Sequence, residues 1–304
     1  MGSPSVADSK KWPLLSFPEW QSTCDTLHMW AQIVGKTRLE LSPYWNHWWQ
    51  TAFYISARGL TTSPIPYGPG IFEVEFDFLH HDLSISTSQG DERILQLYPR
   101  TVADFYREYM ATLKSLEIEV EINTVPQEVP DPIPFEKDQT HASYDQDAVG
   151  RFWRILVNLD CLFKQFRGGF IGKSSPVHFF WGSFDLALTR FSGRPAPVRK
   201  DADAITQEAY SHEVISCGFW PGDRNFPHAA LYAYAAPAPA GFGEQHVRPQ
   251  QAFYSQEMSE FFLKYDDVRS APSPEQAVLD FCQSTYEAGA TLGKWDRKSL
   301  ERNA

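Results

Sequence analysis

Phe72-Glu-Val-Glu-Phe-Asp-Phe78 alternates apolar and acidic residues along its whole length. Because successive side chains of a strand point to opposite faces, Val74 and Phe76 share one face with Phe78, and the acidic residues share the other. This pattern is typical of an antiparallel strand with one face in the core and one in water. Strands of this kind, flanked by helices, are the basis of the fold that we predict.

The neighbouring segments alternate between helical and extended patterns. Apolar residues at helical spacing predict four helices: Pro18–Val34, Thr101–Leu116, Asp145–Phe166 and Pro274–Leu292. Aromatic and β-prone runs predict strands, chiefly Trp48–Ala57, a long Val177–Phe191 with a bulge at Gly182, Glu213–Phe219 and Leu231–Ala235. The sequence therefore predicts the α+β class.

The order of these segments predicts two similar halves. Gln32–Lys36, Ser42-Pro43 and Trp48–Arg58 can be laid over Gln165–Gly169, Ser175-Pro176 and His178–Arg190. We expect each half to be a curved, mostly antiparallel sheet flanked by helices, as an internal duplication would give. The expected units are a disordered tail (1–11), an N-terminal half (12–125), a Pro-rich connector (126–144), a C-terminal half (145–296) and a tail (297–304).

The charge of the chain argues against some classes of partner. The 304 residues carry a formal net charge of -11, and no cluster of Lys or Arg interrupts this acidic character. We therefore expect no nucleic acid and no membrane among the partners. The aromatic content of 15% fits two interpretations, a Phe- and Trp-rich core or an aromatic pocket for a small-molecule ligand.

The cysteines and the termini predict a cytoplasmic protein. Cys24, Cys161, Cys217 and Cys282 are too widely spaced for a disulfide framework or a zinc knuckle. The first residues lack the apolar region of a secretory signal, and no run is long enough to span a bilayer. The oligomeric state is left open by the sequence.

Strong catalytic and cofactor motifs are absent from the sequence. It contains no G-x-G-x-x-G, no Walker loop, no H-E-x-x-H and no G-x-S-x-G. No nucleotide-binding motif is therefore present, and the cofactor is unknown. Any site must be assembled from residues that are distant in the sequence.

Three histidines are the first candidates for chemistry. His47 and His178 begin matching strands of the two predicted halves, and His212 opens another strand. As a set they could act in acid–base catalysis or, with a carboxylate, hold a transition metal. No spacing supports the metal site, and each histidine could equally be a strand residue bonded to backbone.

Other candidates lie on the predicted aromatic strands. Asp185 shares one strand face with Trp181 and small residues, so it either faces solvent or lines a pocket. Arg58 and Arg190 could bind a substrate anion or form structural ion pairs. Tyr67 lies in a stiff, hydroxyl-rich loop that could orient a substrate. We therefore assign His47, His178, His212 and Asp185 to catalysis, and Arg58, Tyr67, Trp181 and Arg190 to substrate binding.

Several long stretches resemble a known family. They are Trp45-Asn-His-Trp-Trp49, Arg58-Gly-Leu-Thr-Thr-Ser-Pro-Ile-Pro-Tyr67, Gly172-Lys-Ser-Ser-Pro-Val-His-Phe-Phe-Trp-Gly-Ser-Phe-Asp185, Arg190-Phe-Ser-Gly-Arg194 and Tyr210-Ser-His-Glu-Val-Ile-Ser216. In these stretches the chain resembles domain-of-unknown-function family 5996, from about Trp12 to Arg297. The resemblance marks these residues as family hallmarks and implies no reaction, cofactor or catalytic residue.

The sequence leaves three functions open. The leading hypothesis is an enzyme that acts on a small organic molecule in an aromatic cleft between the halves, by histidine-based or metal-assisted chemistry. The alternative is a non-catalytic protein that binds a small molecule in the same pocket. In the third, the aromatic residues form only a core, and the protein has an interaction role.

Overall fold

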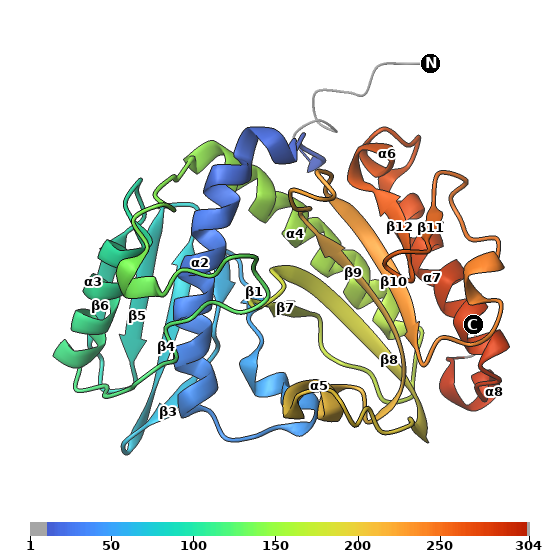
Figure 1. Cartoon of the computed structure of the whole chain (residues 1–304), viewed down its shortest axis with the longest axis horizontal. Helices are drawn as coiled ribbons and strands as arrows, with labels where there is room; N and C mark the ends of the chain where they lie inside the picture. Colours follow the sequence, from blue (N-terminus) through green and yellow to red (C-terminus); the bar gives the residue numbers. More distant parts are fainter. Residues whose placement is uncertain (1–10, 303–304) are drawn as a thin grey trace.

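The computed structural model describes residues 11–302 and contains two antiparallel sheets of six strands each, flanked by helices (Figure 1). The first sheet contains β1 (Tyr54–Ile55), β2 (Gly59–Thr61), β3 (Ile65–Tyr67), β4 (Gly70–Asp77), β5 (Asp82–Thr87) and β6 (Glu92–Gln96). The second contains β7 (His178–Phe180), β8 (Asp185–Pro195), β9 (His212–Trp220), β10 (Ala230–Ala236), β11 (Phe253–Ser255) and β12 (Glu260–Lys264). The predicted α+β class is confirmed.

The helices follow the apolar periodicity of the sequence. They are α2 (Phe17–Leu41), α3 (Val102–Ser115), α4 (Gln146–Gly168), α5 (Ala204–Ala209), α6 (Tyr265–Arg269), α7 (Pro274–Leu292) and α8 (Arg297–Leu300), with short 3₁₀ helices η1 (Asn46–Thr51), η2 (Phe135–Lys137) and η3 (Phe242–Glu244). Side chains cap several of these helices at their first turn. Thr101 accepts a hydrogen bond from the Asp104 N–H, and Asp145 accepts one from the Ala148 N–H.

The two sheets meet at one pair of backbone hydrogen bonds. The Phe53 N–H donates to the Phe179 carbonyl at 2.8 Å, and the Phe179 N–H donates to the Phe53 carbonyl at 2.9 Å. Helix α2 lies across the first sheet, whereas α4 and α7 lie behind the second (Figure 1). On the opposite face of the second sheet lie η1, α5 and the segment at Gln127 and Glu128.

The predicted duplication is not confirmed. The strand order is β1-β2-β4-β5-β6, with β3 paired to β4, in the first sheet, and β11-β12-β10-β9-β8-β7 in the second. Both sheets are open and uncurled, so the curvature that we expected is not found either.

The predicted division into units stays a prediction, although the connector makes close contacts with the first half. The Gln127 N–H donates to Gln32 Oε1 at 2.8 Å, and Gln32 Nε2 donates to the Gln127 carbonyl at 2.7 Å. The expected N-terminal tail lies outside the described residues up to position 10, and Lys11 pairs with Glu275. The expected C-terminal tail includes α8.

Helix α2 continues past the predicted end at Val34 as far as Leu41. Gly35 lies inside this helix and allows another segment to approach its backbone closely. A Cβ atom at this position would lie 2.3 Å from Cγ of Trp181. The helix ends at Leu41, where the N–H of the following Ser42 donates to the Arg38 carbonyl, and Pro43 comes next.

Two predicted strands are also wrong, with consequences for the candidate site. Most of Trp48–Ala57 is not a strand, because His47 and Trp48 adopt left-handed backbone angles within η1. The predicted strand Val177–Phe191 is a hairpin, in which β7 and β8 pair antiparallel. Gly182 therefore lies in the turn and not in a bulge, and Phe184 closes the turn with φ 59°.

No helix among the residues that the structure describes combines the length and the apolar character that crossing a bilayer requires.

The contact at Gly35 can be tested with a matched glycine. We expect Gly35→Ala to destabilise the protein by about 1–3 kcal/mol, because the new methyl group would displace the rigid Trp181 ring. Gly150, inside α4, has open space around the position of a Cβ atom. Gly150→Ala should therefore raise the stability by about 0.5–1 kcal/mol. Urea unfolding measures both, and equal effects of the two substitutions would contradict the packing argument.

Candidate functional site

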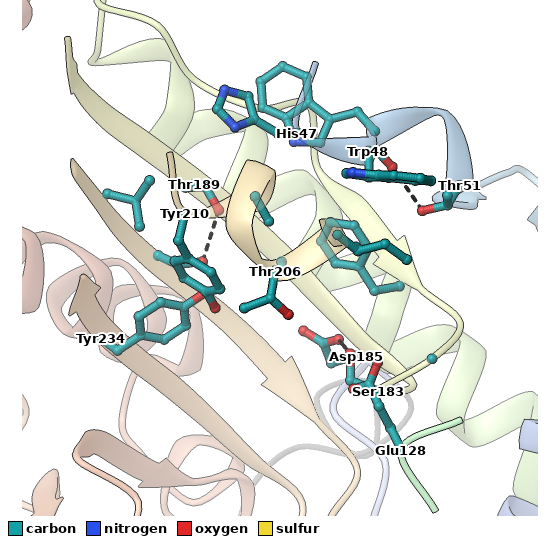
Figure 2. A pocket seen from close by; sticks show the side chains of 18 of the residues that line it. His47, Trp48, Thr51, Glu128, Ser183, Asp185, Thr189, Thr206, Tyr210 and Tyr234 are labelled. Carbon is teal, nitrogen blue, oxygen red and sulfur yellow. Dashed lines mark hydrogen bonds between the residues drawn. The ribbon is translucent and has the colours of Figure 1, made fainter. Parts of the chain in front are cut away.

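A cavity of about 700 Å³ lies on the face of the second sheet that α4 and α7 leave uncovered. Its volume is in the range of small-molecule sites in proteins. Strands β8, β9 and β10 form the floor, η1 and α5 lie over it, and the segment at Glu128 borders one end (Figure 2). Its aromatic lining residues are Trp48, Trp49, Phe180, Trp181, Phe191, Tyr210, Trp220, Tyr232, Tyr234 and Phe262.

The cavity exists because small residues alternate with large ones across the floor. In one cross-strand row, Ala187 of β8 pairs with Gly218 of β9, which pairs with Tyr232 of β10. A Cβ atom at Gly218 would lie 2.3 Å from the Tyr232 hydroxyl, so only glycine admits this tyrosine. In the next row, the hydroxyls of Thr189 and Ser216 are 3.0 Å apart.

Three residues that line the cavity have strained backbone angles. His47 and Trp48 in η1 have φ values of 60° and 59°, and Glu128 has a φ of 56°. Left-handed angles at non-glycine residues cost about 1–3 kcal/mol each and are common at functional sites. Because the strain affects residues that line the cavity, it supports a functional role for this face of the sheet.

Asp185 is the most buried acidic group of the cavity. It begins β8 directly after the turn, and only 6% of its surface is exposed. Its carboxylate accepts hydrogen bonds from the hydroxyls of Ser183 and Tyr232. Burial raises the pKa of Asp185, and the two hydrogen bonds oppose this shift. The result is an oriented carboxylate with a greater tendency to hold a proton than one in water.

Two further carboxylates lie near Asp185. Burial, and after it the charge of Asp185, raise the pKa of Glu260 to about 7. The pKa of Glu128 is raised by the same two causes and by Asp203. Among the lining residues that the structure describes there is no Lys or Arg. The carboxylates therefore repel one another without a cationic side chain between them.

Hydrogen-bonded tyrosines continue the polar floor. The hydroxyls of Tyr210 and Tyr234 are 2.9 Å apart, which links α5 to β10. The rings of Tyr232 and Tyr234 are nearly parallel, with centroids 6.2 Å apart. Burial raises the pKa of both groups well above the usual range, so both remain neutral hydrogen-bond partners.

His47 lies at the opposite end of the cavity from Asp185 and Glu128 (Figure 2). Its Nδ1 lies 3.0 Å from the Glu208 carbonyl, to which it donates, and its Nε2 accepts from Lys173 Nζ at 2.5 Å. Burial lowers the pKa of His47, and the Lys173 charge lowers it further. The imidazole is thus neutral, with both nitrogens engaged.

The other two histidines do not join His47 in one site. His212 lies next to His47, with ring centroids 5.8 Å apart, but does not line the cavity. His178 is 1% exposed and packs under Trp49, with ring centroids 5.5 Å apart. Burial lowers the pKa of His178 to about 3. Within residues 11–302 we find no group of three His, Cys, Asp or Glu side chains that could hold a metal ion.

The predicted substrate-binding residues are divided between the cavity and distant places. Trp181 forms part of the cavity wall, and its Nε1 donates to the Thr51 carbonyl at 2.7 Å. Arg58 and Tyr67 lie on the first sheet, where they bond Asp77 and Gln89. Arg190 lies on the far face of the second sheet.

Arg190 has neither of the partners that the sequence suggested. It is 3% exposed, and its guanidinium carbon lies 3.5 Å from the centroid of the Phe166 ring and 4.4 Å from that of Tyr286. One of its nitrogens donates to the Phe166 carbonyl. Arg190 is therefore held by aromatic faces and backbone, and it is separated from the cavity by the sheet.

Sequence reasoning missed most of the cavity's polar groups. Tyr232 and Tyr234 alternate with alanines in Ala230-Leu-Tyr-Ala-Tyr-Ala-Ala236, a pattern that places both rings on one strand face. That signal could have been found. Glu128 and Glu260 carry no comparable signal, because they come from a loop and from the first residue of a short strand.

The comparisons with known proteins give the family of the chain. The model of a family of unknown function (DUF5996) matches residues 12–302, so the chain belongs to that family, as its motifs predicted. Neither the curated proteins nor the solved structures include a significant match.

The raised pKa of Glu260 predicts a pH-dependent stability. The folded protein holds this proton up to a pH of about 7, whereas a carboxyl with the ordinary pKa of 4.5 releases it earlier. The folded state therefore binds more protons, and its stability falls as the pH rises from 4.5 to 7. We expect Glu260→Gln to stabilise the protein at pH 8 by about 1–2 kcal/mol, since the group is partly solvated.

The gain should disappear below pH 4, where both states are protonated. Glu257→Gln, at an exposed position in the neighbouring turn, is the control and should change little. Urea unfolding at pH 4 and pH 8 measures the effect. A Glu260→Gln protein that is no more stable than the native protein at pH 8 would contradict the repulsion among these carboxylates.

Proposed function

We propose that this protein is an enzyme that binds a small organic molecule in the cavity and uses Asp185 as its acid–base group. The observation that carries the proposal is the position of Asp185, a buried and doubly hydrogen-bonded carboxylate on the floor of a cavity of about 700 Å³. Carboxylates with raised pKa values in aromatic clefts are typical of catalytic sites.

Asp185 is a better candidate than the histidines for proton transfer. Its carboxylate has lone pairs beyond those that Ser183 and Tyr232 use, so it can accept a further hydrogen bond from a ligand. His47 keeps a place in the site as a neutral group at the far end, but both of its nitrogens are occupied. His178 and His212 do not line the cavity.

In the proposed reaction the residues have distinct roles. Ser183 and Tyr232 orient the Asp185 carboxylate toward the ligand, and the aromatic walls exclude water from it. Asp185 then takes a proton from the ligand, or returns one to it.

The second candidate function is a non-catalytic protein that binds a small molecule in the same cavity. The engaged nitrogens of His47 and the neutral tyrosines favour it, because they would hold a ligand without reacting. An interaction role with a purely aromatic core predicts no polar cavity, so we do not propose it.

Turnover can separate the two candidates. A metabolite library is screened for compounds that raise the melting temperature of the protein, and each hit is incubated with it and followed by mass spectrometry. We expect at least one hit to be converted by the native protein. At saturating concentrations of that hit, Asp185→Asn should convert it at least about 100-fold more slowly, because the positioned carboxylate is lost.

Tyr98→Phe is the control, because Tyr98 is exposed outside the cavity and should not affect conversion. Tight binding without conversion by the native protein would favour the binding function. If Asp185→Asn converts the hit at the native rate, Asp185 is not the acid–base group. Circular dichroism verifies that each variant is folded.

A further inference from the structure

We propose that the ligand of the cavity is an organic cation, either an amine protonated at neutral pH or a quaternary ammonium compound, with its charge beside Asp185. This inference rests on the proposed function and adds the chemical class of the ligand. It is carried by three features of the cavity: its charges, its aromatic faces and the arrangement of both along its length.

The first feature is an excess of negative charge. Glu128, Asp185, Asp203 and Glu260 line the cavity, and the lining residues in the described part of the chain include no Lys or Arg. The Asp203 carboxylate is used as the N-cap of α5. The other three are available to a ligand. A neutral or anionic ligand would remove water from these carboxylates without offsetting their negative charge. A cationic ligand would offset that charge.

The second feature is the supply of aromatic faces. Tyr232, whose hydroxyl bonds Asp185, presents its ring to the same cavity as Trp181 and Trp220. Cations bind over the faces of such rings with about 2 kcal/mol when water is excluded. The combination of aromatic faces with a carboxylate is the usual way in which proteins recognise ammonium groups.

The chain's own cations already occupy the aromatic faces near the other end of the cavity. Lys173 Nζ lies 4.7 Å from the centroid of the Phe191 ring and 5.7 Å from that of Trp49. Arg199 lies 4.1 Å from the centroid of the Tyr210 ring. Rings around this cavity therefore bind cations, whereas within residues 11–302 no Lys or Arg lies over the rings of Tyr232, Trp181 or Trp220.

The third feature is the arrangement of the polar groups along the cavity. Asp185, Ser183 and Glu128 gather at one end, and His47 lies at the other (Figure 2). The carboxylate of Glu128 lies over Gly182, where a Cβ atom would be 2.6 Å from its Oε1. This glycine thus allows Glu128 to approach the Asp185 end. A ligand would place its positive group there and its remaining atoms along the aromatic walls.

Three probes of similar size and different charge test the inference. Benzylammonium, benzyl alcohol and benzoate share one ring and are positive, neutral and negative. Isothermal titration calorimetry at pH 8 and low salt measures their Kd values. We expect benzylammonium to bind at least about tenfold more tightly than benzyl alcohol, and benzoate to bind most weakly.

The variants connect this preference to the carboxylates. In Asp185→Asn the affinity for benzylammonium should fall to about that for benzyl alcohol, whose own Kd should not change. Glu260→Gln should also weaken benzylammonium binding, although it should stabilise the folded protein at pH 8. Unfolding therefore cannot explain the loss. Tyr98→Phe, outside the cavity, should leave all three Kd values unchanged.

The outcomes separate this inference from the proposed function. If benzyl alcohol or benzoate binds as tightly as benzylammonium, the inference is wrong and the proposed function stands. If none of the three probes binds, the test is the charge of the compound from the metabolite library that binds most tightly. A cation supports the inference, and a neutral or anionic compound overturns it. If no compound of either set binds, both proposals are wrong.

Discussion

The packing of Trp181 against the backbone of Gly35 joins the parts of the structure that form the cavity. The indole ring lies where any side chain at position 35 would have to be, so α2 and the β7–β8 turn are held at a fixed distance. Trp181 also donates to the Thr51 carbonyl, which attaches η1 to the same turn. His28 of α2 strengthens this junction, because its Nε2 lies 2.8 Å from the Gly182 carbonyl. The side chain of Trp181 therefore fixes the positions of α2, of η1 and of the turn that leads to Asp185.

Residues of the same turn face either the hydrophobic core or the cavity. Phe184 adopts a left-handed backbone angle and stacks against Phe152, with ring centroids 5.5 Å apart. The residues on either side of it, Ser183 and Asp185, face the cavity and bond each other. The stacking energy of Phe184 offsets the backbone strain, and the strain orients the carboxylate. The geometry of the site is thus stabilised by apolar packing on the other side of the sheet.

The cavity has features that a protein selected for stability alone would lose. Three carboxylates repel one another there, small residues leave space unfilled, and bulky residues are held in strained conformations. Each feature costs stability in the free protein. A ligand that offsets the charge repulsion and fills the space would stabilise the folded protein and be bound for that reason. This is the physical basis of both proposals.

The sequence by itself determined the fold class, the main helices and the family. Helical spacing and strand alternation are local signals, and the long motifs are specific. Only the tertiary structure decided which polar residues meet. Left-handed angles at His47, Trp48 and Phe184 turn two predicted strands into a 3₁₀ helix and a hairpin, and this local choice depends on packing against distant segments. The same packing brings Asp185 to Tyr232 and Glu260 and leaves Arg58, Tyr67 and Arg190 elsewhere. A charge or a hydroxyl acts through space, so its partners cannot be read from its position in the chain.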